Sequence, residues 1–220
     1  MTDDVAADPP CSFADRSRRW RLGLVALGGL WELLTLPLVA WDGWSWEWVA
    51  HVYRSAPYQA VSEAIGADPY VVFGALGGLS FLAVGVALLP DMRRAGIGGR
   101  LFAWLIIATG VVSALSYLGT PVDSPLHPLW GAEIFALILV GIAGPFAAAT
   151  AGTCWKRWTR ILMAATILVL AAGLASLGYY PHGPLVSLAA GTALLIAHAP
   201  RDAALRSELG QGSAAAQPRG

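Results

Sequence analysis

Long apolar stretches alternate with short polar connections along most of the chain. Six stretches stand out, at about residues 22–41, 70–89, 101–119, 129–149, 159–179 and 184–199. A helix needs about 20 apolar residues to cross the hydrocarbon layer of a membrane. The pattern therefore predicts an all-α integral membrane protein, with a six-transmembrane helix bundle over residues 17–200.

The composition agrees with a membrane environment. Hydrophobic residues make up 56% of the chain and charged residues only 13%, whereas about 25% of the residues of a soluble globular domain are charged. The two ends differ from this pattern, because residues 1–16 and 201–220 lack apolar periodicity. We expect both ends to be largely disordered tails.

Basic residues gather in every second connection of the six-span pattern. They precede the first stretch, lie between the second and third and between the fourth and fifth, and follow the sixth, whereas the intervening connections carry only Arg54. Because cytoplasmic loops retain Lys and Arg, both termini are expected in the cytoplasm and the chain in a bacterial-type plasma membrane.

The longest connection, about residues 42–69, is rich in aromatic residues and is expected on the outer face. It contains the sequence WDGWSWEW, and Trp44, Trp48 and Val52 follow one another at four-residue spacing. This spacing favours an interfacial helix. Two interpretations stay open for the segment: an aromatic rim at the membrane surface, or a lid over a binding cavity.

Two carboxylic acids fall inside predicted spans. Glu32 lies near the middle of the first span, and Glu133 lies about one turn inside the outer end of the fourth. Ionisable groups at membrane depth are costly, so they usually face a protein interior or a water-filled cavity. We therefore treat both as candidate proton-carrying or catalytic residues.

The connection before the fourth span concentrates further polar chemistry. Three prolines within residues 119–133 oppose a regular helix, which would hold Asp123 and His127 on a stiff turn above Glu133. Such a turn could serve as a proton relay, a headgroup clamp or part of a metal site. It could equally be a polar turn that caps the next helix.

Other side chains near the expected outer mouth could contact a ligand. These candidate ligand-binding residues are Trp31, Trp44, Trp48, His51, Tyr117, Tyr179 and His182. The histidines and acids follow no short metal-binding motif, so we predict neither a metal nor a cofactor. The formal net charge of zero argues against a nucleic-acid partner, which leaves the lipid bilayer and a small amphipathic ligand. The sequence does not indicate a protein partner.

Two stretches carry a family resemblance. Residues 56–89, APYQAVSEAIGADPYVVFGALGGLSFLAVGVALL, and residues 119–133, GTPVDSPLHPLWGAE, resemble the second-span and fourth-span regions of a six-helix prokaryotic membrane family known only as a domain of unknown function. The resemblance covers about residues 56–149 and excludes the Trp-rich WDGWSWEW stretch. It implies no particular reaction, and the positions that it singles out are Ser62, Asp123 and His127.

Three functional hypotheses follow. The first is a protein that binds or moves a small amphipathic or lipid-like molecule through an outward-facing cavity. The second is a membrane-embedded enzyme acting on an isoprenoid or lipid, with Glu32 as general acid and Trp31 beside it to stabilise a developing positive charge. The third is an accessory or resistance protein of the membrane.

Overall fold

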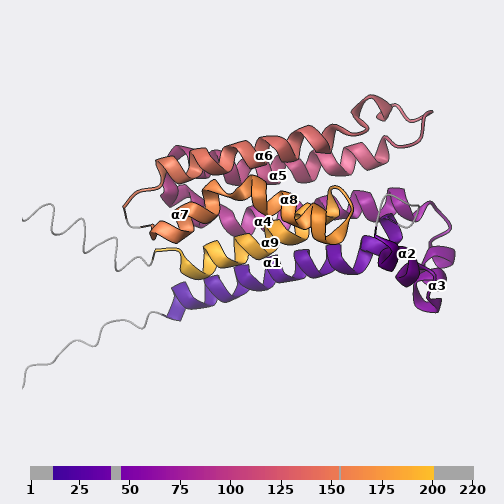
Figure 1. Cartoon of the computed structure of the whole chain (residues 1–220), viewed down its shortest axis with the longest axis horizontal. Coiled ribbons are helices and arrows are strands. Elements are labelled where there is room, and N and C mark those ends of the chain that lie inside the picture. Colours follow the sequence, from indigo (N-terminus) through magenta and orange to yellow (C-terminus); the bar gives the residue numbers. More distant parts are fainter. Residues whose placement is uncertain (1–11, 41–45, 154, 201–220) are drawn as a thin grey trace, which may run out of the picture.

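The protein is helical throughout the residues that the structure describes, which are 12–40, 46–153 and 155–200 of a computed structural model (Figure 1). The all-α prediction is confirmed, and a helix lies at each of the six predicted apolar stretches. The α-helices are α1 (Ser12–Val39), α2 (Glu47–Tyr53), α3 (Ala56–Ile65), α4 (Pro69–Met92), α5 (Gly96–Leu118), α6 (Ala132–Thr150), α7 (Arg157–Ala164), α8 (Thr166–Leu177) and α9 (His182–His198), with short 3₁₀ helices η1 (Arg93–Ala95) and η2 (His127–Leu129).

Local sequence signals set several helix boundaries. Asp68 caps the start of α4 by accepting a hydrogen bond from the backbone N–H of Tyr70, and Pro69 occupies the first helical position. Helices α3 and α8 end at Gly66 and Gly178, with φ of 63° and 74°. Other residues rarely adopt this left-handed conformation, so glycine is the natural terminator there.

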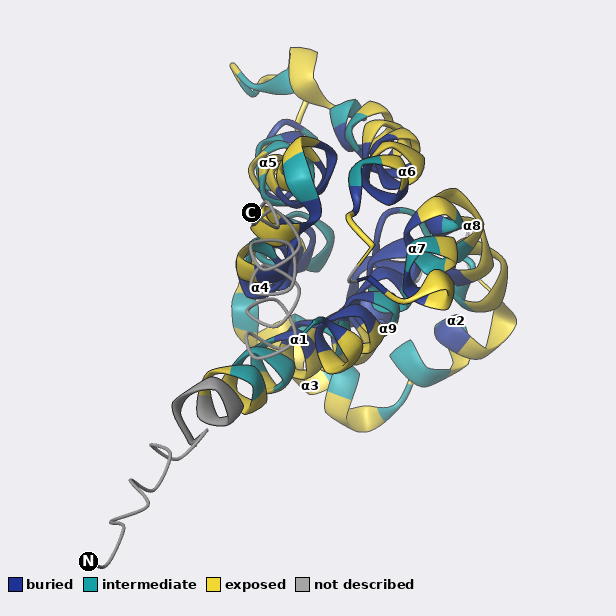
Figure 2. Ribbon diagram, turned by 90° about the vertical axis from the view of Figure 1, so that its left-hand side faces the viewer, coloured by how far each residue is buried: buried dark blue, intermediate teal, exposed yellow. Residues whose placement is uncertain are grey.

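The long helices form a closed ring. In order around the ring, α1 packs on α4, α4 on α5, α5 on α6, α6 on α7 and α8, and α8 on α9, which returns to α1. Figure 2 shows this ring nearly end-on, with buried residues turned inward. Helices α4 and α9 also contact each other. Four helices, α1, α4, α5 and α9, are therefore close enough to build one site.

Helices α4 and α5 form an antiparallel hairpin that depends on glycine. A Cβ atom added to Gly78 would lie 2.4 Å from the carbonyl oxygen of Gly110, and one added to Gly110 would lie 2.6 Å from that of Gly78. Side chains at either position would push the two backbones apart. Small residues thus allow the close helix contact on which packing in lipid relies.

The outward surface is apolar, as a membrane-embedded protein requires. Three stretches of the described residues are long and apolar enough to span a membrane, Ser17–Val39, Pro69–Leu118 and His127–Thr150, and a fourth is obtained if α7 and α8, bent by 61°, count as one span. The second stretch contains both arms of the α4–α5 hairpin. The chain is therefore a candidate multi-span helical membrane protein.

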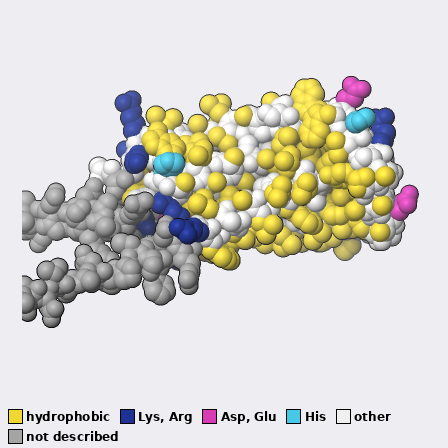
Figure 3. Space-filling view, turned by 90° about the horizontal axis from the view of Figure 1, so that it is seen from below, with side chains coloured by type: hydrophobic (Ala, Val, Ile, Leu, Met, Phe, Trp, Pro, Cys, Tyr) yellow, Lys and Arg dark blue, Asp and Glu magenta, His cyan; other side chains and the backbone are white. Residues whose placement is uncertain are grey.

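One end of the ring, which we name the basic end, carries nearly all the described Lys and Arg residues (Figure 3). It comprises the start of α1, the α4–α5 turn, the α6–α7 connection and the end of α9. Arginines there hold the carbonyl-rich ends of helices: the Arg18 guanidinium donates to the carbonyl oxygens of Ile196 and Ala199, and Arg160 donates to that of Ala148. Cations stabilise helix C-termini, so the basic cluster also fixes the fold.

At the opposite end, which we name the capped end, α2 and α3 lie beside the end of α1 (Figure 1). The Tyr58 hydroxyl donates to the carbonyl oxygen of Leu34 on α1, and the Trp46 indole donates to that of Ala175 on α8. The long aromatic connection is thus partly helical and is tied across the ring from α1 to α8.

Candidate functional site

The most unusual feature of the interior is a contact between Glu32 and His182 near the capped end. Oε2 of Glu32 on α1 directly contacts Nδ1 of His182, the first residue of α9. Both side chains are only 1% exposed. Burying a carboxylate away from water is costly unless it is paired, and His182 provides the pairing.

Tyr117 extends this pair into a chain of three groups. Its hydroxyl lies 3.1 Å from Nε2 of His182, and Tyr117 is itself 2% exposed. With the Nδ1 proton of the imidazole directed at Glu32, Nε2 accepts a hydrogen bond from the Tyr117 hydroxyl. Carboxylate, imidazole and phenol, from α1, α9 and α5, are thus linked in series. We name Glu32, His182 and Tyr117 the buried triad.

Glycines on α4 make the space that the buried triad occupies. A Cβ atom added to Gly77 would lie 2.9 Å from Cε1 of His182 and 3.2 Å from each carboxylate oxygen of Glu32. At Gly74 it would lie 2.0 Å from a ring carbon of Tyr117. The sequence of α4 is therefore shaped around these three side chains, with two glycines one turn apart.

Aromatic side chains cover the buried triad on its capped side. Leu38, Val39, Phe73 and Tyr117 form a buried cluster, and the partly buried residues that pack on it include Tyr53, Tyr58, Ile65, Tyr70 and Tyr179. The rings of Tyr70 and Tyr117 are 5.0 Å apart, and those of Tyr179 and His182 are 6.1 Å apart. Tyrosines from four separate segments thus lie between the triad and the end of the bundle.

Glu133, the second predicted carboxylate, lies in the first turn of α6 and is 9% exposed. Its Oε2 has no hydrogen-bond partner among the described residues. The Tyr180 hydroxyl donates to the carbonyl oxygen of Ile134, at 2.9 Å. Burial raises the pKa of Tyr180, and the charge of Glu133 raises it further, so this phenol keeps its proton and remains a donor.

Polar groups of the turn above Glu133 form hydrogen bonds within that turn. Nδ1 of His127 lies 2.9 Å from the carbonyl oxygen of Gly119, its ring stacks on Trp130, and the Ser124 hydroxyl donates to the carbonyl oxygen of Leu118. Asp123 is exposed. The contacts described for His127 thus tie it to its own turn, and none of them joins it to Glu133.

The other predicted ligand-binding residues lie away from the buried triad. Trp31 is 38% exposed, and its ring centroid lies 6.2 Å from that of Phe73. Although it directly precedes Glu32 in the helix, it faces the outside. Trp48 and His51 are exposed on α2, and Trp44 lies outside the described residues. Tyr117, Tyr179 and His182 are therefore the predicted ligand-binding residues that the fold brings to Glu32.

Two hollows of the structure lie away from the buried triad. An open groove of about 690 Å³ lies at the basic end, and a cavity of about 10 Å³ lies between α5, α7, α8 and α9. Neither is lined by a predicted site residue. Within the described part of the chain, no group of three or more His, Cys, Asp or Glu side chains converges as metal ligands do.

The sequence reasoning missed a buried ion pair between α1 and α4. Arg21 on α1 contacts Asp91 on α4, with 2.6 Å between Nη1 and Oδ2, and it also donates to the carbonyl oxygen of Ala87. Asp91 is 2% exposed. The signal was an acidic residue placed at the end of an apolar stretch, two residues before Arg93.

Comparison with known protein families, with curated proteins and with solved structures found no match. The resemblance to a six-helix membrane family stays a prediction.

Proposed function

We propose that this chain crosses the plasma membrane six times, with both termini in the cytoplasm. We further propose that it binds or moves a small amphipathic molecule at a site that opens at the capped end, with the buried triad as its proton-responsive centre. The observation that carries the proposal is the Glu32–His182 contact, an acid and a base held together in the interior of the bundle.

A purely structural role accounts poorly for such a pair. Buried ion pairs rarely stabilise a fold more than apolar residues of similar volume, so their retention calls for another reason. Helix α4 also has glycine at Gly74 and Gly77, where a side chain would clash with the triad. Glycine inside a helix costs about 1 kcal/mol relative to alanine.

The acidic character of the site favours a ligand with a positive charge or hydrogen-bond donors. Glu32 Oε1 and Glu133 Oε2 are both buried without a hydrogen-bond partner among the described residues. A cationic headgroup would satisfy such oxygens, and an apolar body would suit the aromatic cluster above them.

Binding of a cation would be linked to protons. A cation interacts favourably with the deprotonated triad and unfavourably with the protonated one, so each weakens the binding of the other. The apparent affinity should therefore fall as the pH falls. Tyr53, Tyr58 and Ile65 of α2 and α3 pack on the cluster that contains Tyr117. We propose that these two helices act as a lid that moves when the ligand enters.

The test uses ethidium, a permanently cationic amphipathic dye, with the whole chain in lipid nanodiscs. Binding is measured by fluorescence anisotropy from about pH 5 to pH 8, the range in which imidazoles titrate. We expect weaker binding at the acid end and a strong loss of pH dependence in Glu32→Gln. The matched control is Glu63→Gln, which removes an exposed carboxylate from α3 and should behave like the wild type.

A similarly sized anionic dye, anilinonaphthalene sulfonate, serves as the second probe. Equal binding of both dyes, or an ethidium pH profile that is the same in Glu32→Gln as in the wild type, would contradict the proposal. The six-span topology is tested separately, with reporter fusions at residues 90–100 and 120–128. These two connections must report opposite sides of the membrane.

A further inference from the structure

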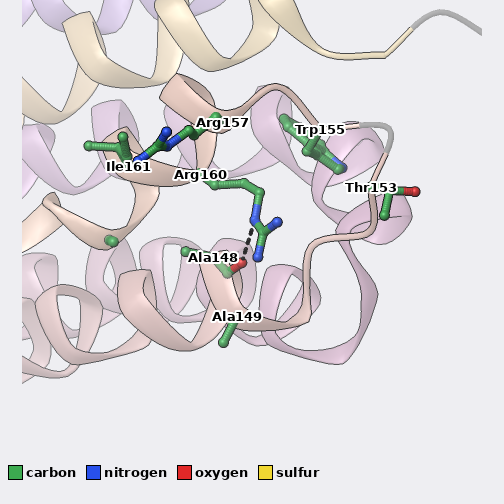
Figure 4. A pocket seen from close by; sticks show the side chains of 8 residues that line it. Ala148, Ala149, Thr153, Trp155, Arg157, Arg160 and Ile161 are labelled. Carbon is green, nitrogen blue, oxygen red and sulfur yellow. Dashed lines mark hydrogen bonds between the residues drawn. The ribbon is translucent and has the colours of Figure 1, made fainter.

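The groove at the basic end lies between the end of α6 and the start of α7 (Figure 4). Its volume of about 690 Å³ is in the range of small-molecule sites. It is lined by Ala148, Ala149, Thr153, Trp155, Arg157, Arg160, Ile161 and Ala164. Two arginines therefore lie in a wall that is otherwise small, apolar or hydroxyl-bearing.

Both arginines of the groove have N–H groups without a hydrogen-bond partner among the described residues. Arg160 uses its Nε to donate to the carbonyl oxygen of Ala148, as the dashed line in Figure 4 marks. No hydrogen bond or ion pair of its amino groups is present among the described residues. Arg157 is exposed and has no acceptor or acidic partner in that part of the chain. Guanidinium groups with free donors are suited to phosphate oxygens.

A further donor lies in the wall of the groove. Trp155 is 2% exposed, and its indole N–H has no hydrogen-bond partner among the described residues. Figure 4 shows Trp155 and Thr153 on one side of Arg160, with Arg157 and Ile161 on the other. Because this nitrogen is buried, the charged donors that the groove offers a ligand are those of the two arginines.

The groove opens onto the apolar outer surface of the bundle. Ile142, Phe146 and Ala149 lie on one stripe of α6, and the first two are 62% and 45% exposed. This stripe runs from the groove toward the middle of the bundle. Ile161, in the wall itself, is 57% exposed. A ligand with a phosphate at one end and a hydrocarbon chain at the other would contact both features.

We propose that this groove binds the headgroup of an anionic phospholipid, with Arg157 and Arg160 contacting the phosphate and an acyl chain lying along the α6 stripe. Basic pockets between helices at a membrane surface are suited to such headgroups. The continuity between the charged groove and the exposed apolar stripe selects a lipid over free phosphate. The site lies at the opposite end of the ring from the buried triad and does not depend on the ligand proposed there.

The experiment measures which lipids remain bound to the purified whole chain. The protein is placed in nanodiscs containing equal amounts of phosphatidylglycerol and phosphatidylcholine, extracted in mild detergent and examined by native mass spectrometry. We expect phosphatidylglycerol to be enriched. Removing one basic residue near a membrane surface costs about 1 kcal/mol, so Arg157→Gln should lower the enrichment about fivefold. The double variant Arg157→Gln/Arg160→Gln should lower it further.

Arg100→Gln is the matched control, because it removes an exposed arginine from the same end of the ring outside the groove. It should retain the wild-type enrichment. Arg157→Gln breaks no described contact, so it stays informative even if loss of the Arg160–Ala148 bond prevents the double variant from folding. Equal retention of both lipids by the wild type, an equal loss in Arg100→Gln, or displacement of the lipid by millimolar inorganic phosphate would overturn the proposal.

Discussion

Replacing either member of the Glu32–His182 pair by leucine should destabilise the fold by unequal amounts. In His182→Leu the buried Glu32 carboxylate loses its partner, and an uncompensated buried charge costs about 3–5 kcal/mol. In Glu32→Leu a neutral imidazole is left with one unsatisfied N–H, which costs about 1–3 kcal/mol. His182→Leu should therefore be the more destabilising variant, because it leaves a buried charge and Glu32→Leu does not.

The double variant Glu32→Leu/His182→Leu gives a more specific prediction. With both side chains replaced, no buried charge remains, and the main loss is the hydrogen bond between Tyr117 and Nε2 of His182. The expected cost is again about 1–3 kcal/mol, well below the roughly 4–8 kcal/mol sum of the single losses. The difference is the coupling energy of the pair.

These free energies are measured by unfolding the purified chain in mixed micelles with increasing denaturing detergent. All three variants and the wild type are compared in one series at neutral pH. Single losses that add up to the double loss within about 0.5 kcal/mol would show that Glu32 and His182 are not coupled. A Glu32→Leu loss larger than that of His182→Leu would refute the assignment of a buried carboxylate.

Four further substitutions test other parts of the structure by the same unfolding assay. Gly77→Ala should cost about 1–3 kcal/mol because its methyl group crowds the pair, whereas Gly191→Ala, whose Cβ has an ordinary contact at 3.6 Å, should gain up to about 1 kcal/mol of helix propensity. Asp91→Leu should lower the free energy of unfolding by about 3–5 kcal/mol, because the Arg21 guanidinium loses its acidic partner. An unchanged free energy of unfolding would contradict the buried pair. Tyr180→Phe should cost about 1 kcal/mol and should leave the alkaline tyrosinate absorbance unchanged, because the raised pKa keeps this phenol protonated in the wild type.

The sequence predicted the helices well because apolar length is a strong signal in membrane proteins. It also indicated that Glu32 faces an interior, since a carboxylate in an apolar stretch rarely faces lipid. It did not reveal the partner. The sequence reasoning placed His182 in a connection with other polar residues, whereas α8 ends at Leu177 and α9 begins at His182 itself, inside the ring.

Other parts of the site could not be predicted, for physical reasons. Which face of a helix turns inward depends on packing between helices, so the neighbouring residues Trp31 and Glu32 were placed together although they point apart. The turn that carries His127 satisfies its own polar groups, which adjacency in sequence does not show. Arg21 was read as a signal of orientation, and its contact with Asp91 joins positions 70 residues apart.

The most direct measurement of the central claim is proton release on ethidium binding, recorded with a pH indicator in weakly buffered nanodisc solutions at the acid end of the pH series, where ethidium binding is weakened. If the buried triad exchanges a proton for a cation, the wild type should release up to about one proton per ethidium bound, and Glu32→Gln should release almost none. Equal release by both proteins, or none by the wild type despite binding, would contradict a proton-responsive site at Glu32.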